Sequence, residues 1–531
     1  MSPIDVSIII AYFAIILGIG FYFSKKKDTT DEYFLANRNI GWFVVGSALF
    51  ASNIGSEHLV GLAGSGASDG VAVAQYEILA SLMLLLLGWF FVPFYIRSGV
   101  ATMPEFLEKR YSSSSRWYLS LLSIFAYIVT KIAITIAAGG IVFNALMGID
   151  FWTGAFIVVI LTGVYTVFGG LRAVVYTETI QTVILLIGSL VVLIGGLNAI
   201  GGWDAMVGQA KDGAMSLWKP ISHPDFPWTG MIFGAPILGV WYWCTDQNIV
   251  QRVLSARDID QARKGTIFAG FLKILPLFLF VIPGILAAGL DETGHINLTD
   301  NDKALPVLVN ALLPVGLKGL VVAGLLAALM SSLASVFNSC STLITLDIYS
   351  KISPDQPQEK LVRFGQLTTI VMVILGLLFI PFIAFFGDGL FQSLQAIQSL
   401  ISPPIAAVFL LGILFKRLNS QGAIASLSVG FIIGMSRFIA TVSGATYESG
   451  SWLDIIFGMN HLHFAALLFV ICTVVLIVVS LATPAETGEK AKQVEDLTYK
   501  KSEKHEKYVT KNAFYSYLLI GLVILMWYIF S

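Results

Sequence analysis

An apolar segment long enough to cross a bilayer covers residues 42–62, and a polar stretch with a glycine interrupts it at residues 51–58 (ASNIGSEH). Hydrocarbon offers no partners to backbone N–H and C=O groups, so such an interruption persists only where it is buried in protein or lines a cavity. Carbonyl groups freed there can replace the hydration shell of an ion, while Asn53, Glu57 and His58 can hold a polar solute. Interrupted membrane helices are typical of the midplane sites of secondary transporters, and the segment predicts such a site.

The rest of the chain has the composition of a membrane protein. Of its 531 residues, 56% are hydrophobic and 12% are charged, about half of the roughly 25% charge of a soluble domain. Apolar stretches of about twenty residues recur to the C-terminus, which predicts one polytopic membrane domain. The net charge of −1 does not indicate a nucleic-acid partner, and Cys244, Cys340 and Cys472 lie in apolar segments without metal-ligand spacing.

These apolar stretches predict an all-α polytopic membrane protein with about fourteen membrane-spanning helices. Their approximate limits are 5–23, 41–66, 72–96, 117–146, 152–169, 174–200, 229–251, 265–290, 308–340, 362–386, 390–415, 420–443, 460–482 and 513–530. No basic residue precedes the first segment and lysines 25–27 follow it, so we expect residues 1–24 to form an additional helix with its N-terminus outside, not a signal peptide. Alternation from there puts most lysines and arginines in cytoplasmic loops, in agreement with the positive-inside rule.

Residues 483–512 are charged and lack core hydrophobes, which predicts a cytoplasmic linker before a C-terminal helix at 513–531. The sequence has no P-loop, so nothing indicates ATP-driven transport. The membrane segments contain no nucleophile–base pair and no metal-ligand cluster, and we expect no catalytic residues and no enzyme activity. No obligatory protein partner is evident.

A second interrupted helix is predicted at residues 327–335 (AALMSSLAS). Ser331, Ser332 and Ser335 place hydroxyls at adjacent and one-turn positions among small side chains, an arrangement that suits a hard cation with oxygen ligands. The alternative is close helix packing, for which serine and alanine are equally suited. Together with the first interrupted helix, the pattern favours an ion site.

Few ionisable side chains lie within the apolar segments, and each costs on the order of 2.5–3.5 kcal/mol at the bilayer centre. They are Glu57, Glu77, Lys131, Glu178, Lys273 and Arg437. Glu77 and Lys273 lie deep in their segments, where they could neutralise each other and offer polar atoms to hydroxyl groups. Glu178 and Arg437 lie near helix ends and could instead extend to the interface.

Two further segments combine groups that can bind a sugar. In residues 241–247 (WYWCTDQ), rings that can stack on the C–H faces of a sugar precede a carboxylate and an amide that can bond its hydroxyls. An interfacial aromatic belt is the alternative. Gln392, Gln395 and Gln398 share one helical face, where they could bridge helices or hold a polar ligand.

These motifs together resemble the sodium:solute symporter family, and within it the sodium/glucose cotransporter branch. The resemblance covers about residues 31–481. It is carried by ASNIGSEH at 51–58, GVATMPEFL at 99–107, VWYWCTDQ at 240–247, SS at 331–332 with NS at 338–339, DIY at 347–349 and PPIAAVF at 403–409. It implies an inverted five-plus-five helix repeat, here residues 41–200 and 229–415, with a broken first core helix and two flanking helices at 420–482.

The resemblance also implies which residues bind sodium and a monosaccharide. Sodium would lie between the first broken helix and the eighth core helix, held by the carbonyls of Ala51, Ile54 and Ala328 and the hydroxyls of Ser331 and Ser332. The side chains around the sugar would be Asn53, His58, Glu77, Trp243, Lys273 and Gln395. The inner gate would be Tyr242, and the outer gate would be Leu62, Tyr76 and Phe391.

Three positions depart from the family's pattern. Gly239 stands where relatives place a polar side chain near the sugar, so one hydrogen bond would be missing. For a second sodium, some relatives use a hydroxyl pair and an aspartate, whereas here Ala334 replaces one hydroxyl, Ser335 remains and Glu178 replaces the aspartate. We therefore expect one sodium per sugar. Glu57 also stands where some relatives have glycine.

The sequence thus predicts a sodium-coupled symporter that imports glucose or galactose by alternating access. A symporter of another polar solute, such as myo-inositol, and a non-coupled sodium or solute channel are the alternatives. Short external loops without paired cysteines favour a bacterial inner membrane.

Overall fold

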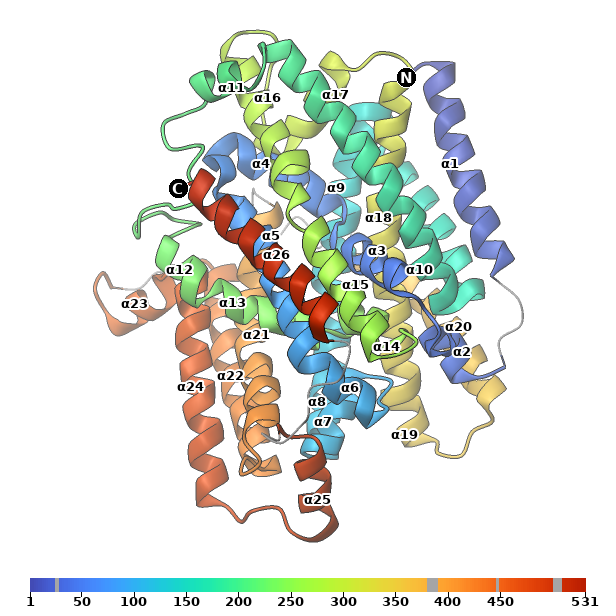
Figure 1. Ribbon diagram of the computed structural model, residues 1–531, viewed down its shortest axis with the longest axis vertical. Coiled ribbons are helices and arrows are strands. Elements are labelled where there is room, and N and C mark those ends of the chain that lie inside the picture. The colour runs from blue at the N-terminus through green and yellow to red at the C-terminus, as the bar shows by residue number, and fades with distance from the viewer. Residues whose placement is uncertain (24–27, 380–389, 446–447, 500–508) are drawn as a thin grey trace.

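The computed structural model describes residues 1–23, 28–379, 390–445, 448–499 and 509–531 (Figure 1). Within these ranges every regular element is a helix, which confirms the all-α prediction. Eleven of the described helices are long and apolar enough to cross a membrane. Lysines 25–27, the end of the predicted helix at 362–386 and residues 500–508 of the predicted linker lie outside the described residues.

Helices follow one another closely, and several are continued by short η segments of 3-10 or π geometry. The helices up to residue 209 are α1 (Pro3–Tyr22), α2 (Thr30–Leu35), η1 (Ala36–Arg38), α3 (Trp42–Asn53), α4 (Ser56–Asp69), η2 (Gly70–Val73), α5 (Ala74–Leu86), η3 (Leu87–Phe91), α6 (Val92–Ser98), α7 (Met103–Arg110), α8 (Ser113–Ala126), η4 (Tyr127–Ile132), α9 (Ala133–Val142), η5 (Phe143–Met147), α10 (Phe151–Ile200) and α11 (Trp203–Gln209).

The second half of the chain is organised in the same way. Its helices are α12 (Trp228–Phe233), α13 (Ala235–Gly239), η6 (Val240–Thr245), α14 (Gln247–Leu254), α15 (Ile259–Leu272), η7 (Leu277–Val281), α16 (Ile282–Glu292), η8 (Asn301–Lys303), α17 (Ala304–Leu312), α18 (Leu317–Thr342), η9 (Leu343–Tyr349), α19 (Ser350–Ile352), α20 (Gln358–Phe379), α21 (Leu390–Leu414), α22 (Ser420–Val442), α23 (Trp452–Gly458), α24 (His461–Ala482), α25 (Gly488–Asp496) and α26 (Val509–Ile529).

The spans are fewer than the fourteen predicted segments because some segments are joined and others divided. Helix α10 contains the predicted segments 152–169 and 174–200 as two helices that meet at a kink at Gly170, whose φ of 59° and ψ of −163° are not helical. Only glycine adopts this conformation freely, and a Cβ here would lie 2.6 Å from the carbonyl oxygen of Tyr33. The predicted segment at 229–251 is divided among α12, α13, η6 and α14.

The predicted interruption of the first core helix is confirmed. Helix α3 ends at Asn53, Ile54 (φ −79°, ψ 91°) and Gly55 (φ −94°, ψ −179°) are extended, and α4 begins at Ser56. A Cβ at Gly55 would collide with the carboxylate of Glu57, so the close approach of that side chain requires glycine. The break frees backbone groups inside the protein, where other helices surround them.

The prediction of an interrupted helix at residues 327–335 is wrong. Helix α18 runs through this stretch without a break, because serine hydroxyls can find hydrogen-bond partners without interrupting a helix. Ser335 donates to the Glu178 carboxylate of α10. Ser331 donates to the carbonyl of Ala328 at 2.9 Å, and Ser339 to that of Ser335 at 2.9 Å. The second break lies at Asp246 (φ −73°, ψ 126°), between η6 and α14. Each of the two ranges predicted as repeats therefore begins with an interrupted helix.

Helix α18 lies at the centre of the bundle, and 94% of its most apolar stretch is buried. It packs along α10, while α3 packs against both α15 and α10. Helices α21, α22 and α24 pack together on one side, at the lower left in Figure 1, and α26 crosses in front against α5 and α15.

In the predicted linker, α25 is anchored by Lys490, which donates to the carbonyls of Glu108 and Lys109 at 3.0 and 2.9 Å.

Candidate functional site

The interrupted helix meets α18 at a cluster of oxygen atoms. The hydroxyl of Ser331 lies 2.9 Å from the carbonyl oxygen of Ala51 at the end of α3 and 2.9 Å from that of Ala328 one turn earlier on α18. All three residues are buried. Because a hydroxyl hydrogen can rotate, the oxygen can cease to donate and turn a lone pair towards a cation. The structure therefore brings three of the five predicted sodium ligands together.

The other two predicted ligands lie next to this cluster. Ile54 is the first extended residue after α3 and is fully buried, and Ser332 follows Ser331 and lines the adjoining cavity. The set consists of carbonyl and hydroxyl oxygens, which are the ligands that hard cations prefer. A sodium site at these residues stays a prediction, and this arrangement supports it.

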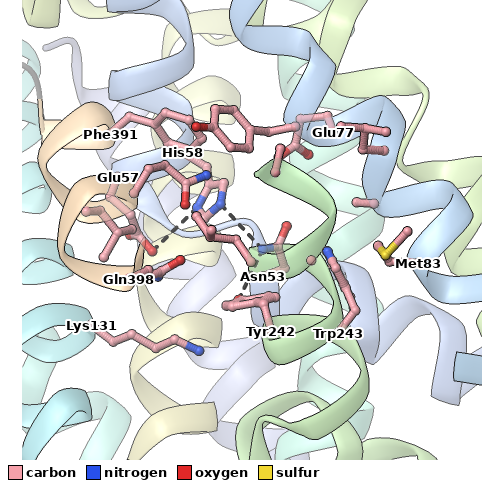
Figure 2. Close-up of a pocket in the computed structure, with 18 of the residues that line it drawn as sticks. Asn53, Glu57, His58, Glu77, Met83, Lys131, Tyr242, Trp243, Phe391 and Gln398 are labelled. Atoms are coloured by element: carbon pink, nitrogen blue, oxygen red, sulfur yellow. Dashed lines mark hydrogen bonds and ion pairs between the residues drawn. The ribbon is translucent and has the colours of Figure 1, made fainter. Parts of the chain in front are cut away.

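A cavity of about 60 Å³ adjoins the cluster (Figure 2). It is several times larger than the space of about 10–15 Å³ that one water needs. Its polar lining consists of Ser52, Asn53, Glu57, His58, Glu77, Lys131, Ser332, Gln395 and Gln398. Its aromatic lining consists of Tyr76, Tyr242, Trp243 and Phe391. Five of the six predicted sugar contacts line this cavity, and the sixth, Lys273, does not.

Asn53 connects the cavity to the oxygen cluster. Its amide nitrogen donates to the Tyr242 hydroxyl at 3.1 Å and lies 3.4 Å from Nε2 of His58. Its amide oxygen accepts a hydrogen bond from Lys273. Asn53 stands between Ala51 and Ile54 in the chain. A shift of the backbone at the oxygen cluster would therefore move the Asn53 side chain in the cavity.

Lys273 lies behind the cavity wall and positions two residues of the wall. Its ammonium group is fully buried and is shared between the Asn53 amide oxygen and the Glu77 carboxylate. The predicted pairing of Glu77 with Lys273 is therefore present in the structure. A buried charge pair of this kind needs its full set of hydrogen bonds, because each ion alone would be strongly penalised away from water.

Glu57 and His58 occupy the first turn of α4, where the helix dipole favours negative charge. One carboxylate oxygen of Glu57 accepts from Thr135 at 3.0 Å, and the other lies 3.5 Å from Nδ1 of His58. Nδ1 of His58 has no hydrogen-bond partner among the described residues, and the other ring nitrogen is directed to Asn53. His58 can exchange hydrogen bonds with a polar solute in the cavity through that nitrogen.

Asp246, whose carboxylate was expected to bond a sugar, does not line the cavity and instead belongs to a charged cluster beside Tyr242, the predicted inner gate. Below Asn53 in Figure 2, the Lys131 ammonium lies 4.4 Å from the centre of the Tyr242 ring, a cation–π distance. Lys131 also pairs with Asp246 at 3.1 Å, and Asp246 accepts from the Tyr127 hydroxyl. Both charges were visible in the apolar segments, but only the fold shows that they meet at the second helix break.

Of the three residues predicted as the outer gate, Tyr76 and Phe391 line the cavity. Phe391 is 1% exposed, and its ring centre lies 5.7 Å from that of Tyr76 and 5.5 Å from that of His58. The Tyr76 hydroxyl lies 3.1 Å from Nε2 of His461 on α24. Leu62 is fully buried and does not line the cavity.

The three glutamines of α21 have different positions, although they share a helical face. Gln392 donates to the Ser65 hydroxyl on α4 at 2.7 Å and so bridges two helices. Gln395 and Gln398 line the cavity instead. The helix-bridging alternative therefore occurs for Gln392, and ligand contact by Gln395 or Gln398 stays a prediction.

Replacing Gln395 with alanine should weaken sugar binding about fivefold and leave sodium activation unchanged, because it removes a neutral hydrogen-bonding group worth roughly 1 kcal/mol beside the cavity. The measurement is the apparent KM for sugar and for sodium in proteoliposomes. Gln392→Ala is the matched control and should leave the KM for sugar within about twofold. A similar rise in KM for both variants would mean that α21 packing, not ligand contact, is affected.

Gly239 is covered by Met83 in this structure. A Cβ at Gly239 would lie 2.7 Å from Cγ and 3.2 Å from Sδ of Met83, and both residues line the cavity. This part of the wall is therefore apolar. The arrangement supports the prediction that one hydrogen bond to the solute is absent.

Glu178, the carboxylate considered for a second sodium, is already paired with the guanidinium of Arg252. Glu178 is fully buried and accepts from Arg252 at 2.9 Å, from Ser52 at 3.0 Å and from Ser335. Glu178 does not extend to the interface. The Arg252 side chain is fully buried against Glu178 inside the bundle. The guanidinium compensates the carboxylate without an ion.

Arg437, the other ionisable side chain near a helix end, lies outside the site. It donates to the carbonyl of Met459 at 2.5 Å, and its guanidinium stacks 4.2 Å from the ring centre of Phe464. These contacts hold α22 against α24. Its role is therefore structural.

Comparison with known proteins identifies relatives over most of the chain. The sequence profile of the sodium:solute symporter family matches residues 33–430. Sodium/glucose cotransporter 1 of Oryctolagus cuniculus is 39% identical over 521 residues, which cover 90% of this chain and 79% of that protein. The protein of the same name from Ovis aries is 40% identical over 526 residues, with 90% and 78% covered. Solute carrier family 5 member 4 of Rattus norvegicus is 37% identical over 525 residues, with 91% and 78% covered.

Solved structures share the fold. A Na⁺-coupled sialic acid symporter in a substrate-bound outward-open state matches with a TM-score of 0.80 at 23% identity, covering 91% of this chain and 99% of that chain. MHP1, a nucleobase-cation-symport-1 family transporter in a closed conformation, matches with a TM-score of 0.51 at 15% identity, covering 89% and 100%. These likenesses confirm the predicted transporter fold.

Proposed function

The chain belongs to the sodium:solute symporter family, and we propose that it imports a monosaccharide, glucose or galactose, together with sodium. The relatives named sodium/glucose cotransporter 1 support sugar as the solute. The observation that carries the proposal is the position of Asn53. This residue lines the solute cavity while its chain neighbours Ala51 and Ile54 belong to the oxygen cluster that meets α18.

We propose alternating access between an outer and an inner gate. Sodium binds where α3 meets α18 and stabilises the arrangement in which sugar can enter past Phe391 and Tyr76. The outer gate then closes, and Tyr242 moves away from Asn53 to release sugar to the inside. The solutes are moved without a chemical step, so we assign the chain no enzymatic reaction.

One sodium ion per sugar is enough to drive accumulation. Moving one charge through 100 mV provides about 2.3 kcal/mol, and a tenfold sodium gradient adds about 1.4 kcal/mol. The sum of about 3.7 kcal/mol supports accumulation of several hundredfold. The pairing of Glu178 with Arg252 supports one ion, because the second set of ligands is already compensated.

Uptake by proteoliposomes tests the proposal. We expect saturable uptake of labelled glucose or galactose that requires an inward sodium gradient and falls to background when potassium replaces sodium. Unlabelled sugar on the opposite side should drive counterflow, which a channel does not show. Uptake that is the same in both salts, or faster for myo-inositol than for any hexose, would contradict the assignment.

We place the protein in a bacterial inner membrane, for which its short external loops are suited.

A further inference from the structure

A second and larger hollow lies away from the transport pathway, on the outside of the bundle. It has a volume of about 570 Å³ and lies between the beginnings of α3 and α26 and the middle and end of α15. We call it the basal groove and define it by the residues that line it: Trp42, Lys264, Ile267, Phe268, Phe271, Lys511, Asn512, Tyr515 and Leu518. None of these residues lines the solute cavity.

The basal groove has a basic end and an apolar length. Lys264 lies in the second turn of α15 and Lys511 in the first turn of α26, and Phe271 and Leu518 lie about two turns further along the same helices. Trp42 and Tyr515 are 41% and 51% exposed. Aromatic residues of this kind mark the level of the lipid headgroups.

The two lysines face the leaflet in which anionic lipids are concentrated. The charge bias of the loops predicts that α3, α15 and α26 all begin on the cytoplasmic side. The cytoplasmic leaflet carries anionic phospholipids, and basic pockets between membrane helices on that side bind their headgroups. Charge complementarity therefore selects an anionic occupant over a zwitterionic one.

One end of the groove is pre-organised by hydrogen bonds. Asp260 accepts from Lys264 at 2.6 Å and from the Asn512 amide at 2.8 Å, which joins α15 to α26. An ammonium group has three donors, so Lys264 keeps two for a phosphate. The Lys264 side chain is 40% exposed. The sum of the three charges, two lysines and one aspartate, is +1.

We propose that the basal groove binds one anionic glycerophospholipid, with its phosphate between Lys264 and Lys511 and one acyl chain along Phe268, Phe271 and Leu518. The Trp42 and Phe268 rings lie 5.4 Å apart and edge to face, and they would contact the first carbons of the acyl chain. Such a lipid would contact the base of α3, which carries predicted ion ligands, and the part of α15 that leads to Lys273. Its binding does not depend on the proposed sugar transport.

Native mass spectrometry of the purified full chain, titrated with phosphatidylglycerol or phosphatidylcholine, tests the site. We expect one phosphatidylglycerol to be retained with at least tenfold preference over phosphatidylcholine. The double variant Lys264→Gln/Lys511→Gln should weaken that binding about thirtyfold, since each lysine near a headgroup contributes about 1 kcal/mol. Soluble glycerophosphoglycerol should not compete, because it lacks the acyl chains.

Lys351→Gln is the matched control. Lys351 is also paired with a carboxylate, Glu108 at 2.9 Å, and its side chain is 38% exposed, but it lies outside the groove. Its replacement should leave phosphatidylglycerol binding unchanged. Equal retention of both lipids by the unmodified protein would overturn the proposal. This measurement does not depend on the folding of any variant. An equal loss in the control would also overturn it, because general surface charge would then explain the binding.

Discussion

The variant Ser331→Ala should need about thirtyfold more sodium for half-maximal sugar uptake. The hydroxyl lies 2.9 Å from the carbonyl oxygens of both Ala51 and Ala328, so its loss removes a ligand from the point where the interrupted helix meets α18. A hydrogen-bonding group that contacts a charge is worth roughly 2 kcal/mol, which corresponds to that factor. The measurement is sodium-dependent uptake in proteoliposomes at saturating sugar.

Ser341→Ala is the control on the same helix. Ser341 is equally buried, but its hydroxyl donates to the carbonyl of Gly365 at 2.6 Å, away from the oxygen cluster. Its sodium activation should match that of the unmodified protein. If Ser331→Ala retained normal sodium activation, the ion site at this cluster would have to be abandoned.

The variant Lys273→Met should lose sugar uptake and a large part of its stability. It leaves the carboxylate of Glu77 buried without a counter-ion and removes the donor that holds the Asn53 amide. Removing one partner of a buried ion pair costs about 3–5 kcal/mol. We expect a clear fall in the thermal unfolding midpoint of the detergent-solubilised protein, together with uptake at background.

The double variant Lys273→Met/Glu77→Gln separates stability from function. Neutralising Glu77 removes the uncompensated charge, so the unfolding midpoint should recover in large part while uptake stays low, because Asn53 is still not held. Lys351→Met is the control: its ion pair with Glu108 is partly exposed and contributes at most about 1 kcal/mol. A double variant that transports normally would show that Lys273 serves folding alone.

Most of the predicted membrane segments could be located from the sequence because hydrophobicity along twenty residues is a local property. The interruption at Ile54 and Gly55 was also predictable, since a glycine among polar residues favours a break in a helix that is buried in protein or lines a cavity. The same reasoning failed at α18. There, Ser331 and Ser339 satisfy their hydroxyls within the helix, so a polar stretch in the sequence did not produce a break.

The positions of side chains around the cavity were predictable only in part. The pairing of Glu77 with Lys273 followed from the shared cost of burying each charge, and the structure contains it. The distribution of Gln392 and Gln395 between a helix contact and the cavity did not follow from spacing, because residues one turn apart on a helix share a face but meet different neighbours.

The sequence by itself determined that this chain is a bundle of membrane helices with a functional break near residue 54, because both features depend on neighbouring residues alone. Only the tertiary structure decided which buried charges meet. Glu178 lies beside Arg252, and Lys131 beside Asp246, across 74 and 115 residues of chain. Burial requires every charge to find a partner, but only the packing of distant helices selects which partner it is.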